Sequence, residues 1–449
     1  MKQWFQMFSV LCLMSLLFFG SPPFASAVVF SDVPADHWAC TEISSMADRG
    51  LIQGSNGNFY PSEPISTQAF LSMLCRASGL DDRNLEPGSN WSDPAIAYGR
   101  YFEWFDDSEL TQENKTTPIT REFAAKLLVN ALFSDQLSTG STLPFRDAYT
   151  ISRSCGPHVK TAAQLGLIGG YADGSFYPKD TLSRAAAAAL LSRAIDLKET
   201  AQSGNSIQVP ILMYHDVSYL GSGYSKTPET FRAQMQELKD AGFHTIFFSE
   251  LIDYVENGAE LPSKPIVISI DDGYQTNYTY VFPILKELEM KAEISLIGDA
   301  ILLADWGLHR NEIREMANSS LVSFQAHTKS LHGDHTAQGG RLGVLKTDSE
   351  SWDDYVTVLG DDTKAILDLV EREAGSRPQV FTYPRGKWND MSEGIISKLG
   401  CKASVTTKNG IAVITQGDPS SLYLMDRVGM DFRNGSVITI LDEFGYQIP

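Results

Sequence analysis

Six short apolar runs in the second half of this 449-residue chain alternate with stretches of helical periodicity. Two of the helical stretches cover residues 231–241 and 363–373. The apolar runs span 209–214, 265–270, 292–297, 321–324, 380–383 and 403–406. Strands and helices that alternate in this way are typical of α/β folds. This half is therefore predicted to be an α/β domain.

Two adjacent carboxylates, Asp271 and Asp272, directly follow the run at 265–270. An α/β barrel keeps its catalytic groups at this end of its strands. Further along, His327 and His332 supply two imidazoles five positions apart. Each signal alone is also typical of a turn, a helix cap or a polar loop.

Together these residues predict an open metal site made of one Asp and two His. Three protein ligands leave positions for water and substrate, and a divalent cation lowers the pKa of a bound water from about 15.7 to about 7. The second Asp is then free to act as a base.

The whole region from 209 to the C-terminus resembles the polysaccharide deacetylase family, carbohydrate esterase family 4, also called the NodB-homology domain. The segment 211–216, Ile-Leu-Met-Tyr-His-Asp, is similar to that family's opening strand, and 381–386, Phe-Thr-Tyr-Pro-Arg-Gly, to its third motif. The His spacing and the early Tyr-His pair are similar to the subgroup that acts on exopolysaccharides rich in N-acetylglucosamine. The resemblance implies a distorted (β/α) barrel of about seven strands, with the metal at the C-terminal strand ends.

The resemblance also implies roles for the site residues in a hydrolytic N-deacetylase acting on an N-acetylglucosamine polymer. Asp272, His327 and His332 are expected to hold a divalent metal, and Asp271 to take a proton from the attacking water. His215 is the candidate acid for the departing amine. Zinc is favoured because Asp and His ligands suit it, with cobalt or nickel as alternatives.

The third motif departs from the family pattern, because many relatives have Arg where Thr382 stands and an aromatic residue where Arg385 stands. Either Arg385 or Arg427 could instead orient Asp271 and keep it ionised. A backbone N–H in the loop around Tyr383 is expected to stabilise the oxyanion.

Two other functions stay open at this point. The family's later His motif is missing, which agrees either with His215 as the acid or with a silent barrel kept for binding wall glycans. The same metal chemistry could also remove O-acetyl groups, as in an acetylxylan esterase.

The N-terminus has the pattern of a secretory signal. It carries Lys2, an apolar stretch at 10–19 and Ala25-Ser26-Ala27, which fits cleavage before Val28. The apolar stretch is shorter than the roughly 20 residues that a spanning helix needs. We therefore expect a secreted protein with no membrane anchor after cleavage.

The composition limits the classes of partner that this protein is expected to bind. The formal charge of −19 argues against binding nucleic acid or an anionic membrane surface, and is compatible with neutral or cationic glycans. The four cysteines beyond the signal are too few and scattered for a disulfide scaffold, although pairing among the first three stays open. They are Cys40, Cys75, Cys155 and Cys401.

The first half of the chain contains an internal repeat. Gly-Leu-Ile-Gln-Gly at 50–54, followed by Asn-Phe-Tyr-Pro at 58–61, recurs as Gly-Leu-Ile-Gly-Gly at 166–170 and Ser-Phe-Tyr-Pro at 175–178. A middle copy shows in Trp-Ser-Asp-Pro at 91–94 and Pro-Ile-Thr-Arg at 118–121. Each unit is predicted to be a helix, a turn and a second helix opened by a Ser or Thr cap.

These units resemble three S-layer homology repeats, an all-helical module with which bacterial surface proteins bind cell-wall polysaccharide. The resemblance implies that Arg121 and Arg184 bind an acidic wall glycan, because guanidinium suits bidentate carboxylate recognition. Repeat one has Thr67 at that position, so one of three grooves is in doubt. A wall-associated location is expected.

The sequence thus divides into six segments. Residues 198–208 are polar and are expected to be a flexible linker that lets the enzyme sample the nearby wall. The segments are a signal peptide (1–27), repeats one (28–86), two (87–140) and three (141–197), the linker (198–208) and the deacetylase domain (209–449).

Overall fold

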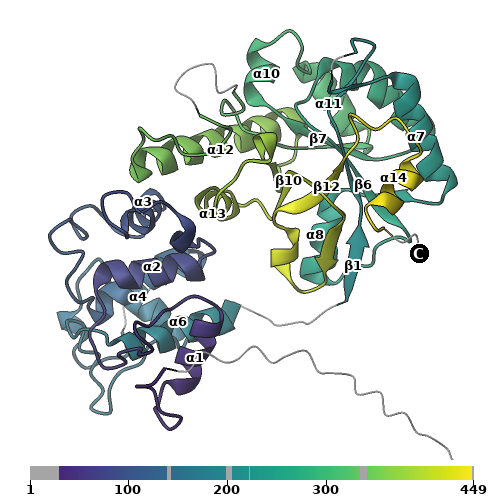
Figure 1. Cartoon of the computed structure of the whole chain (residues 1–449). Coiled ribbons are helices and arrows are strands. Elements are labelled where there is room, and N and C mark those ends of the chain that lie inside the picture. Colours follow the sequence, from purple (N-terminus) through teal and green to yellow (C-terminus); the bar gives the residue numbers. More distant parts are fainter. Residues whose placement is uncertain (1–29, 139–142, 199–204, 222, 334–340, 447–449) are drawn as a thin grey trace, which may run out of the picture.

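The structure is a computed structural model that describes residues 30–138, 143–198, 205–221, 223–333 and 341–446. The expected signal segment lies outside these residues, as does 199–204 within the expected linker. A helical N-terminal spindle is followed by an α/β barrel (Figure 1). Within the described ranges, no helix has both the length and the apolar character required to cross a bilayer.

Seven parallel strands form a closed barrel, which confirms the predicted fold class. They follow the order β2-β12-β10-β9-β8-β7-β6, and β6 pairs back with β2 to close the ring. A short strand, β5 (His244–Thr245), extends the sheet beside β6. The barrel strands are β2 (Ile211–Tyr214), β6 (Pro265–Ile270), β7 (Ala292–Leu296), β8 (Val322–Ala326), β9 (Val380–Thr382), β10 (Ala403–Asn409) and β12 (Met425–Gly429).

The predicted strand at 209–214 is divided at Pro210. A proline cannot donate to a sheet ladder. The residues before it form β1 (Ser206–Val209), which pairs antiparallel with β11 (Ala412–Thr415) outside the barrel, while β2 continues as a fully buried barrel strand. Strand β12 was not predicted, because Asp426 and Arg427 interrupt its apolar pattern.

Helices surround the barrel strands (Figure 1). The predicted helix at 363–373 is only the C-terminal half of α12 (Trp352–Ala374), whose first turn is capped by the Ser351 hydroxyl. The helix predicted at 231–241 is α7 (Pro228–Asp240). The others are α8 (Phe248–Asn257), α9 (Phe282–Leu288), α10 (Gly298–Leu303), α11 (Arg310–Asn318), α13 (Asp390–Lys398) and α14 (Val437–Glu443).

The spindle consists of three helix pairs around an approximate threefold axis. At the axis, the amide of Ile65 donates to Leu182 O, that of Leu182 to Ile119 O, and that of Ile119 to Ile65 O, at 3.0, 3.1 and 3.0 Å. This closed ring joins equivalent positions of the three repeats that the sequence predicted. The pairs are α1 (Cys40–Asp48) with α2 (Thr67–Ala77), α3 (Asp93–Tyr101) with α4 (Arg121–Leu132), and α5 (Gly156–Gln164) with α6 (Arg184–Lys198).

The spindle lies directly against the barrel, where α3 packs on α12 and α13. A freely moving barrel on a flexible tether is therefore not what the structure shows. Cys40, Cys75, Cys155 and Cys401 are all free thiols.

Candidate active site

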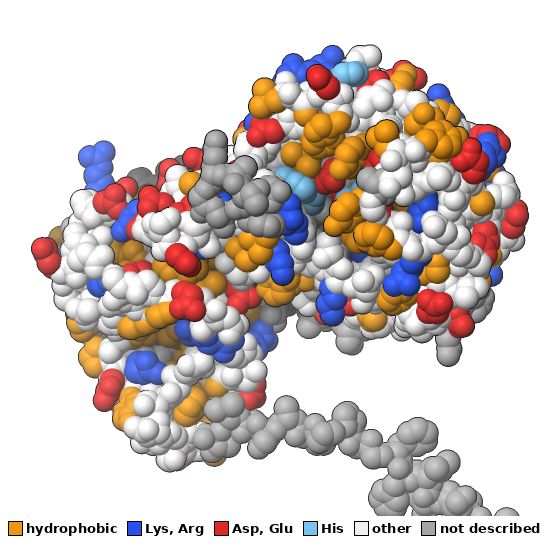
Figure 2. All heavy atoms as spheres, turned by 45° about the horizontal axis from the view of Figure 1, so that its top comes forward, with side chains coloured by type: hydrophobic (Ala, Val, Ile, Leu, Met, Phe, Trp, Pro, Cys, Tyr) orange, Lys and Arg blue, Asp and Glu red, His pale blue; other side chains and the backbone are white. Residues whose placement is uncertain are grey.

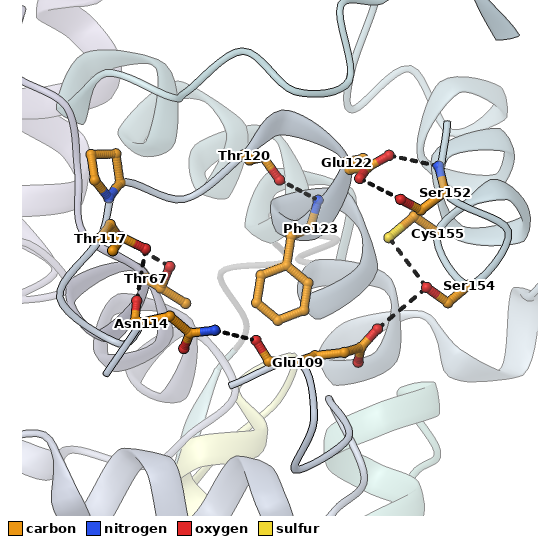
Figure 3. Close-up of a pocket in the computed structure, with 11 residues that line it drawn as sticks. Thr67, Glu109, Asn114, Thr117, Thr120, Glu122, Phe123, Ser152, Ser154 and Cys155 are labelled. Atoms are coloured by element: carbon orange, nitrogen blue, oxygen red, sulfur yellow. Dashed lines mark hydrogen bonds between the residues drawn. The ribbon is translucent and has the colours of Figure 1, made fainter. Parts of the chain in front are cut away.

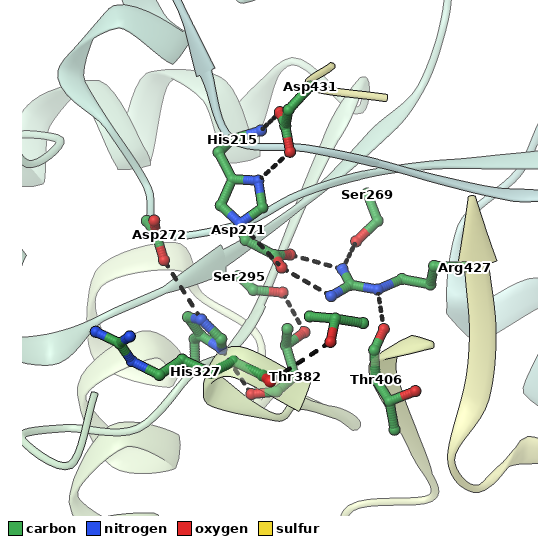
Figure 4. Close-up of polar contacts among 12 residues, drawn as sticks. His215, Ser269, Asp271, Asp272, Ser295, His327, Thr382, Thr406, Arg427 and Asp431 are labelled. Atoms are coloured by element: carbon green, nitrogen blue, oxygen red, sulfur yellow. Dashed lines mark hydrogen bonds and ion pairs between the residues drawn. The ribbon is translucent and has the colours of Figure 1, made fainter. Parts of the chain in front are cut away.

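The carboxyl edge of the barrel gathers the predicted metal ligands. Asp272 lies two residues after the end of β6, and His327 directly follows β8 (Figure 4). His332 lies five residues after His327. The Nε2 atoms of His327 and His332 lie 3.4 and 3.3 Å from Asp272 Oδ1. One ligand atom from each residue falls within 4.8 Å of the others, the spacing of a site for a single cation.

The surroundings of these three side chains fit a divalent metal. Asp272 Oδ1 is buried without a hydrogen-bond partner, and buried polar atoms are rarely left in this state. Asp272 also has a φ of 72°, a left-handed conformation that is uncommon for residues other than glycine. A cation bound by this oxygen and the two imidazoles would satisfy it.

The sheet beside the site fixes the tautomer of His327. Its Nδ1 donates to the carbonyl oxygen of Thr382, 2.6 Å away, so its Nε2 is left as a free ligand atom. Burial acts to raise the pKa of Asp272, but the two imidazoles outweigh it and hold that pKa well below its usual value. The carboxylate is thus ready to bind a cation.

Asp271, the expected base, is held by Arg427 of β12. Nη1 and Nη2 of the guanidinium lie 2.7 and 2.8 Å from the two carboxylate oxygens, and Nη1 also donates to Ser269 Oγ. Both side chains are almost fully buried. Burial acts to raise the pKa of Asp271, but Arg427 outweighs it and keeps the pKa below its ordinary value. Asp271 is therefore ionised at neutral pH.

His215, at the end of β2, lies between two carboxylates. Its Nδ1 is 2.8 Å from Asp431 Oδ2, and its Nε2 is 3.9 Å from Asp271 Oδ2. Burial acts to lower the pKa of His215, but Asp431 and then Asp271 raise it to about 9. His215 therefore carries a proton at neutral pH and can donate one.

Asp431 was missed in the sequence, although it directly follows a barrel strand. It could be found only after β12 had been recognised, since it lies at the same edge as Asp271 and His215. Lys226, also missed, is buried and donates to the carbonyl oxygens of Asp431 and Arg433, at 3.2 and 2.7 Å. These contacts hold the loop that carries Asp431.

Two predicted site residues lie differently from expectation. Arg385 is exposed, and the guanidinium that contacts Asp271 belongs to Arg427. Tyr383 turns its ring into the core, and its hydroxyl donates to Glu393, 3.1 Å away. Its amide donates to Val405 O inside the sheet, so the N–H for an oxyanion would have to come from another residue of this loop.

Aromatic side chains surround the site. Tyr224 lies 5.6 Å from both the His215 ring and the Phe432 ring, measured between centroids. Near Asp272, Tyr274 packs on Trp306 at 4.9 Å. Tyr224, Phe432 and Trp306 are exposed, and Figure 2 shows histidine side chains at the surface of this face among hydrophobic ones. Such surfaces suit the apolar faces of sugar rings.

The two arginines predicted to bind wall glycan occupy equivalent grooves of the spindle. Arg121 donates through Nε and Nη2 to the carbonyl oxygens of Phe176 and Gly169, and Arg184 does the same to Phe59 and Gln53. Each guanidinium also lies over the ring of the same phenylalanine, at 4.8 and 4.7 Å. These contacts fix both guanidinium groups in the same orientation.

The groove of repeat one is different. Thr67 takes the place of arginine and lines a hollow of about 380 Å³ (Figure 3). Glu109 and Glu122 line the same hollow and are paired with Lys126 and Lys179. This groove is lined by carboxylate–lysine pairs where the other two have a guanidinium.

The fold and the site together define an α/β barrel with a carboxylate–histidine cluster and an acid–base pair at its carboxyl edge. Comparison with known proteins agrees with this description. A family model for polysaccharide deacetylases matches residues 258–404, and one for the S-layer homology domain matches 29–66 and 144–188. The middle repeat is outside both matches.

Two relatives and one solved structure illustrate the similarity. The chain is 30% identical to YxkH of Bacillus subtilis over 221 residues, 49% of this chain and 71% of that protein. It is 26% identical to the poly-beta-1,6-N-acetyl-D-glucosamine N-deacetylase of Escherichia coli K12 over 211 residues, 42% of this chain and 31% of that protein. The deacetylase PplD of Streptococcus pyogenes, solved with acetate, is 23% identical, with a TM-score of 0.45 over 54% of this chain and 99% of that one.

The chain therefore belongs to the polysaccharide deacetylase family, with S-layer homology repeats in its N-terminal half.

Proposed function

We propose that this protein is a metal-dependent, wall-anchored deacetylase that hydrolyses the N-acetyl groups of an N-acetylglucosamine polymer. The observation that carries the proposal is the position of Asp271. It forms a bidentate ion pair with Arg427 and lies beside the cluster of Asp272, His327 and His332. A buried, ionised base next to an open ligand set suits amide hydrolysis better than simple glycan binding.

The residues divide the work as follows. Asp272, His327 and His332 would hold the cation, which would supply a lowered pKa for water and a Lewis acid for the acetyl carbonyl. Asp271 takes a proton from the attacking water, and Arg427 keeps its carboxylate ionised and correctly turned. His215, protonated beside Asp431, gives its proton to the departing amine.

The altered third motif does not argue against activity in this arrangement. The arginine expected at position 382 is replaced in space by Arg427, which reaches Asp271 from β12. The missing later His is likewise replaced by His215, which lies 3.9 Å from the base. A barrel that had lost catalysis would have no need to keep this buried ion pair and the orphaned carboxylate oxygen of Asp272.

The nature of the substrate is supported by two features. Relatives such as the Escherichia coli enzyme are named for the N-deacetylation of poly-beta-1,6-N-acetyl-D-glucosamine. The exposed aromatic rings beside His215 and Asp272 could pack on neighbouring sugars of such a polymer.

Anchoring is proposed through the spindle. Arg121 and Arg184 would bind acidic groups of a secondary wall polysaccharide, and the chain would act at the cell surface after cleavage of the signal at 1–27. The segment boundaries given above, with a linker at 198–208, are part of this proposal.

The test is acetate release by the full chain, loaded with zinc, from N-acetylglucosamine oligomers and from acetylated xylan in parallel. Release from the oligomers is expected. Release from acetylated xylan alone would make the protein an O-deacetylase. Release from neither, with both glycans still bound, would contradict hydrolysis and favour a binding protein.

A further inference from the structure

The spindle packs along the barrel through helix α3 of repeat two and through the end of repeat one. Tyr98, fully buried, donates its hydroxyl to the carbonyl oxygen of Gly394 in α13, 2.9 Å away. At the start of α12, Trp352 Nε1 donates to Glu86 O at 2.7 Å. Apolar residues from both parts belong to one continuous buried cluster. The contact is therefore packed like a hydrophobic core and is not a loose surface contact.

Two glycines inside barrel helices mark the closest approach. A Cβ atom at Gly360 of α12 would lie 2.2 Å from the ring of Tyr101, and one at Gly394 of α13 would lie 3.2 Å from Leu80. Glycine destabilises a helix interior relative to almost any other residue except proline. Both glycines are buried under the spindle, so their lack of a side chain is what lets the helices meet.

Polar contacts surround this seam. Arg100 pairs with Asp353, and the hydroxyl of Tyr101 donates to Asp361 at 3.1 Å. On the other side, Asn84 Nδ2 donates to Asp390 Oδ2 at 3.1 Å. Such rim contacts contribute little to affinity but fix the orientation of the two surfaces.

The first turn of repeat two differs from its counterparts in repeats one and three, which lie against Arg184 and Arg121. In repeats one and three, Asp32 and Asp147 each accept two amide hydrogens from the Phe-Tyr turn beneath the groove arginine. The equivalent Asp93 instead accepts from the amides of Ser89 and Asn90, which precede it. The stretch between the two S-layer homology matches, 67–143, contains all the spindle residues named in the seam.

We propose that the spindle face formed by the end of repeat one and by α3 of repeat two serves to dock the catalytic barrel and not to bind glycan, while Arg121 in α4 of repeat two keeps its proposed glycan contact. The docking face is formed by Leu80, Asn84, Glu86, Tyr98, Arg100 and Tyr101. It holds the barrel edge in one orientation relative to the grooves of Arg121 and Arg184. This last step rests on the proposed function: if those grooves bind the wall, the active site acts on glycan at a fixed distance from the anchor.

The test uses small-angle X-ray scattering and thermal unfolding of the full chain, wild type and Gly360→Leu/Gly394→Leu. If the barrel helices are docked, leucine side chains force the seam apart, so the radius of gyration rises and the melting temperature falls. If the helices face solvent, leucine improves both helices, so the melting temperature rises at constant radius of gyration. That second result would overturn the proposal, and neither readout depends on activity.

Two further variants test whether the effect of the leucines comes from the contact between the spindle and the barrel. Gly156→Leu is the matched control, because a Cβ atom at this first residue of α5 meets nothing within 4 Å; its radius of gyration should equal that of the wild type. Tyr101→Ala removes the ring that faces Gly360, so it should return Gly360→Leu to the compact form. A Gly360→Leu variant that is as compact as the wild type, or an expanded one that Tyr101→Ala does not restore, would also contradict docking.

Discussion

Arg427 binds Asp271 through two parallel contacts of 2.7 and 2.8 Å, and neither side chain is open to solvent. The two residues are 156 positions apart in the chain and meet only because β12 and β6 flank β2 in the closed barrel. This pair places a cation beside Asp271 that keeps the carboxylate ionised and fixes its direction.

Replacing Arg427 should therefore disable the base. In Arg427→Lys the bidentate contact with Asp271 is lost. In Arg427→Ala the buried carboxylate of Asp271 has no counter-charge, so the pKa of Asp271 rises. We expect kcat to fall by about 100-fold or more, because general bases typically contribute about 10² to 10⁴. Arg427→Ala should also lose about 3 to 5 kcal/mol of stability, as buried unpaired charges do.

Initial-rate measurements on the variants, with chemical denaturation for stability, check this prediction. Arg385→Ala is the matched control: Arg385 is exposed, so the stability of this variant should stay close to that of the wild type. Unaltered turnover in Arg427→Ala would show that Arg427 does not orient the base.

Asp431→Asn should change the alkaline side of the pH–rate profile. Asp431 is the main group that raises the pKa of His215 to about 9, and a neutral amide removes that charge. The proton on His215 would then be lost at a lower pH, so activity should decline earlier as pH rises. A pH–rate profile of kcat with the same alkaline limb in both proteins would contradict the role of His215 as acid.

Glu393→Gln should stabilise the protein above neutral pH. Burial raises the pKa of Glu393 from 4.5 to about 7. Between these values the folded state keeps a proton that the unfolded state has lost, so stability falls as pH rises from about 4.5 through 7. The difference amounts to about 3 kcal/mol once the group is ionised in both states.

Denaturant unfolding at pH 5 and pH 8 measures this effect. The wild type should lose stability between the two pH values more steeply than Glu393→Gln. The exposed Glu260→Gln serves as the control and should follow the wild type. An equal pH dependence in Glu393→Gln would mean that Glu393 is ionised throughout.

Wall binding should depend on the two groove arginines. Arg121→Ala and Arg184→Ala each remove a guanidinium that lies over a phenylalanine ring, so affinity for purified wall polysaccharide should fall about tenfold per site. Co-sedimentation with wall fragments checks this. Arg153→Ala, an exposed arginine in repeat three, is expected to bind like the wild type, and equal loss in all three variants would point to non-specific charge.

The sequence predicted the parts of the site that follow recognisable strands. Asp271 and Asp272 follow the unbroken apolar run of β6, and His327 and His332 follow β8, so their meeting at one barrel edge could be expected. Asp431 could not be predicted, because β12 carries two charged residues and does not look like a buried strand. One of those residues is Arg427, whose charge is tolerated inside the barrel only because Asp271 lies opposite.

The position of the spindle was likewise beyond the sequence. Gly360 and Gly394 look like weak points in two helices until the rings of Tyr101 and Tyr98 are placed against them. A polar linker is typical of independent domains, and the docking face is built from residues scattered between 80 and 101. Only the packing of α3 on the barrel reveals that the spindle is docked against the barrel.

The most direct test of the central claim is a zinc titration of the chelated full chain, with acetate release from N-acetylglucosamine oligomers followed at each step. Release should begin with the first equivalent of zinc. His327→Ala should lose both tight zinc binding and release, while Asp271→Asn should bind zinc but release no acetate. Acetate release that persists after chelation, or in zinc-loaded Asp271→Asn, would contradict the account.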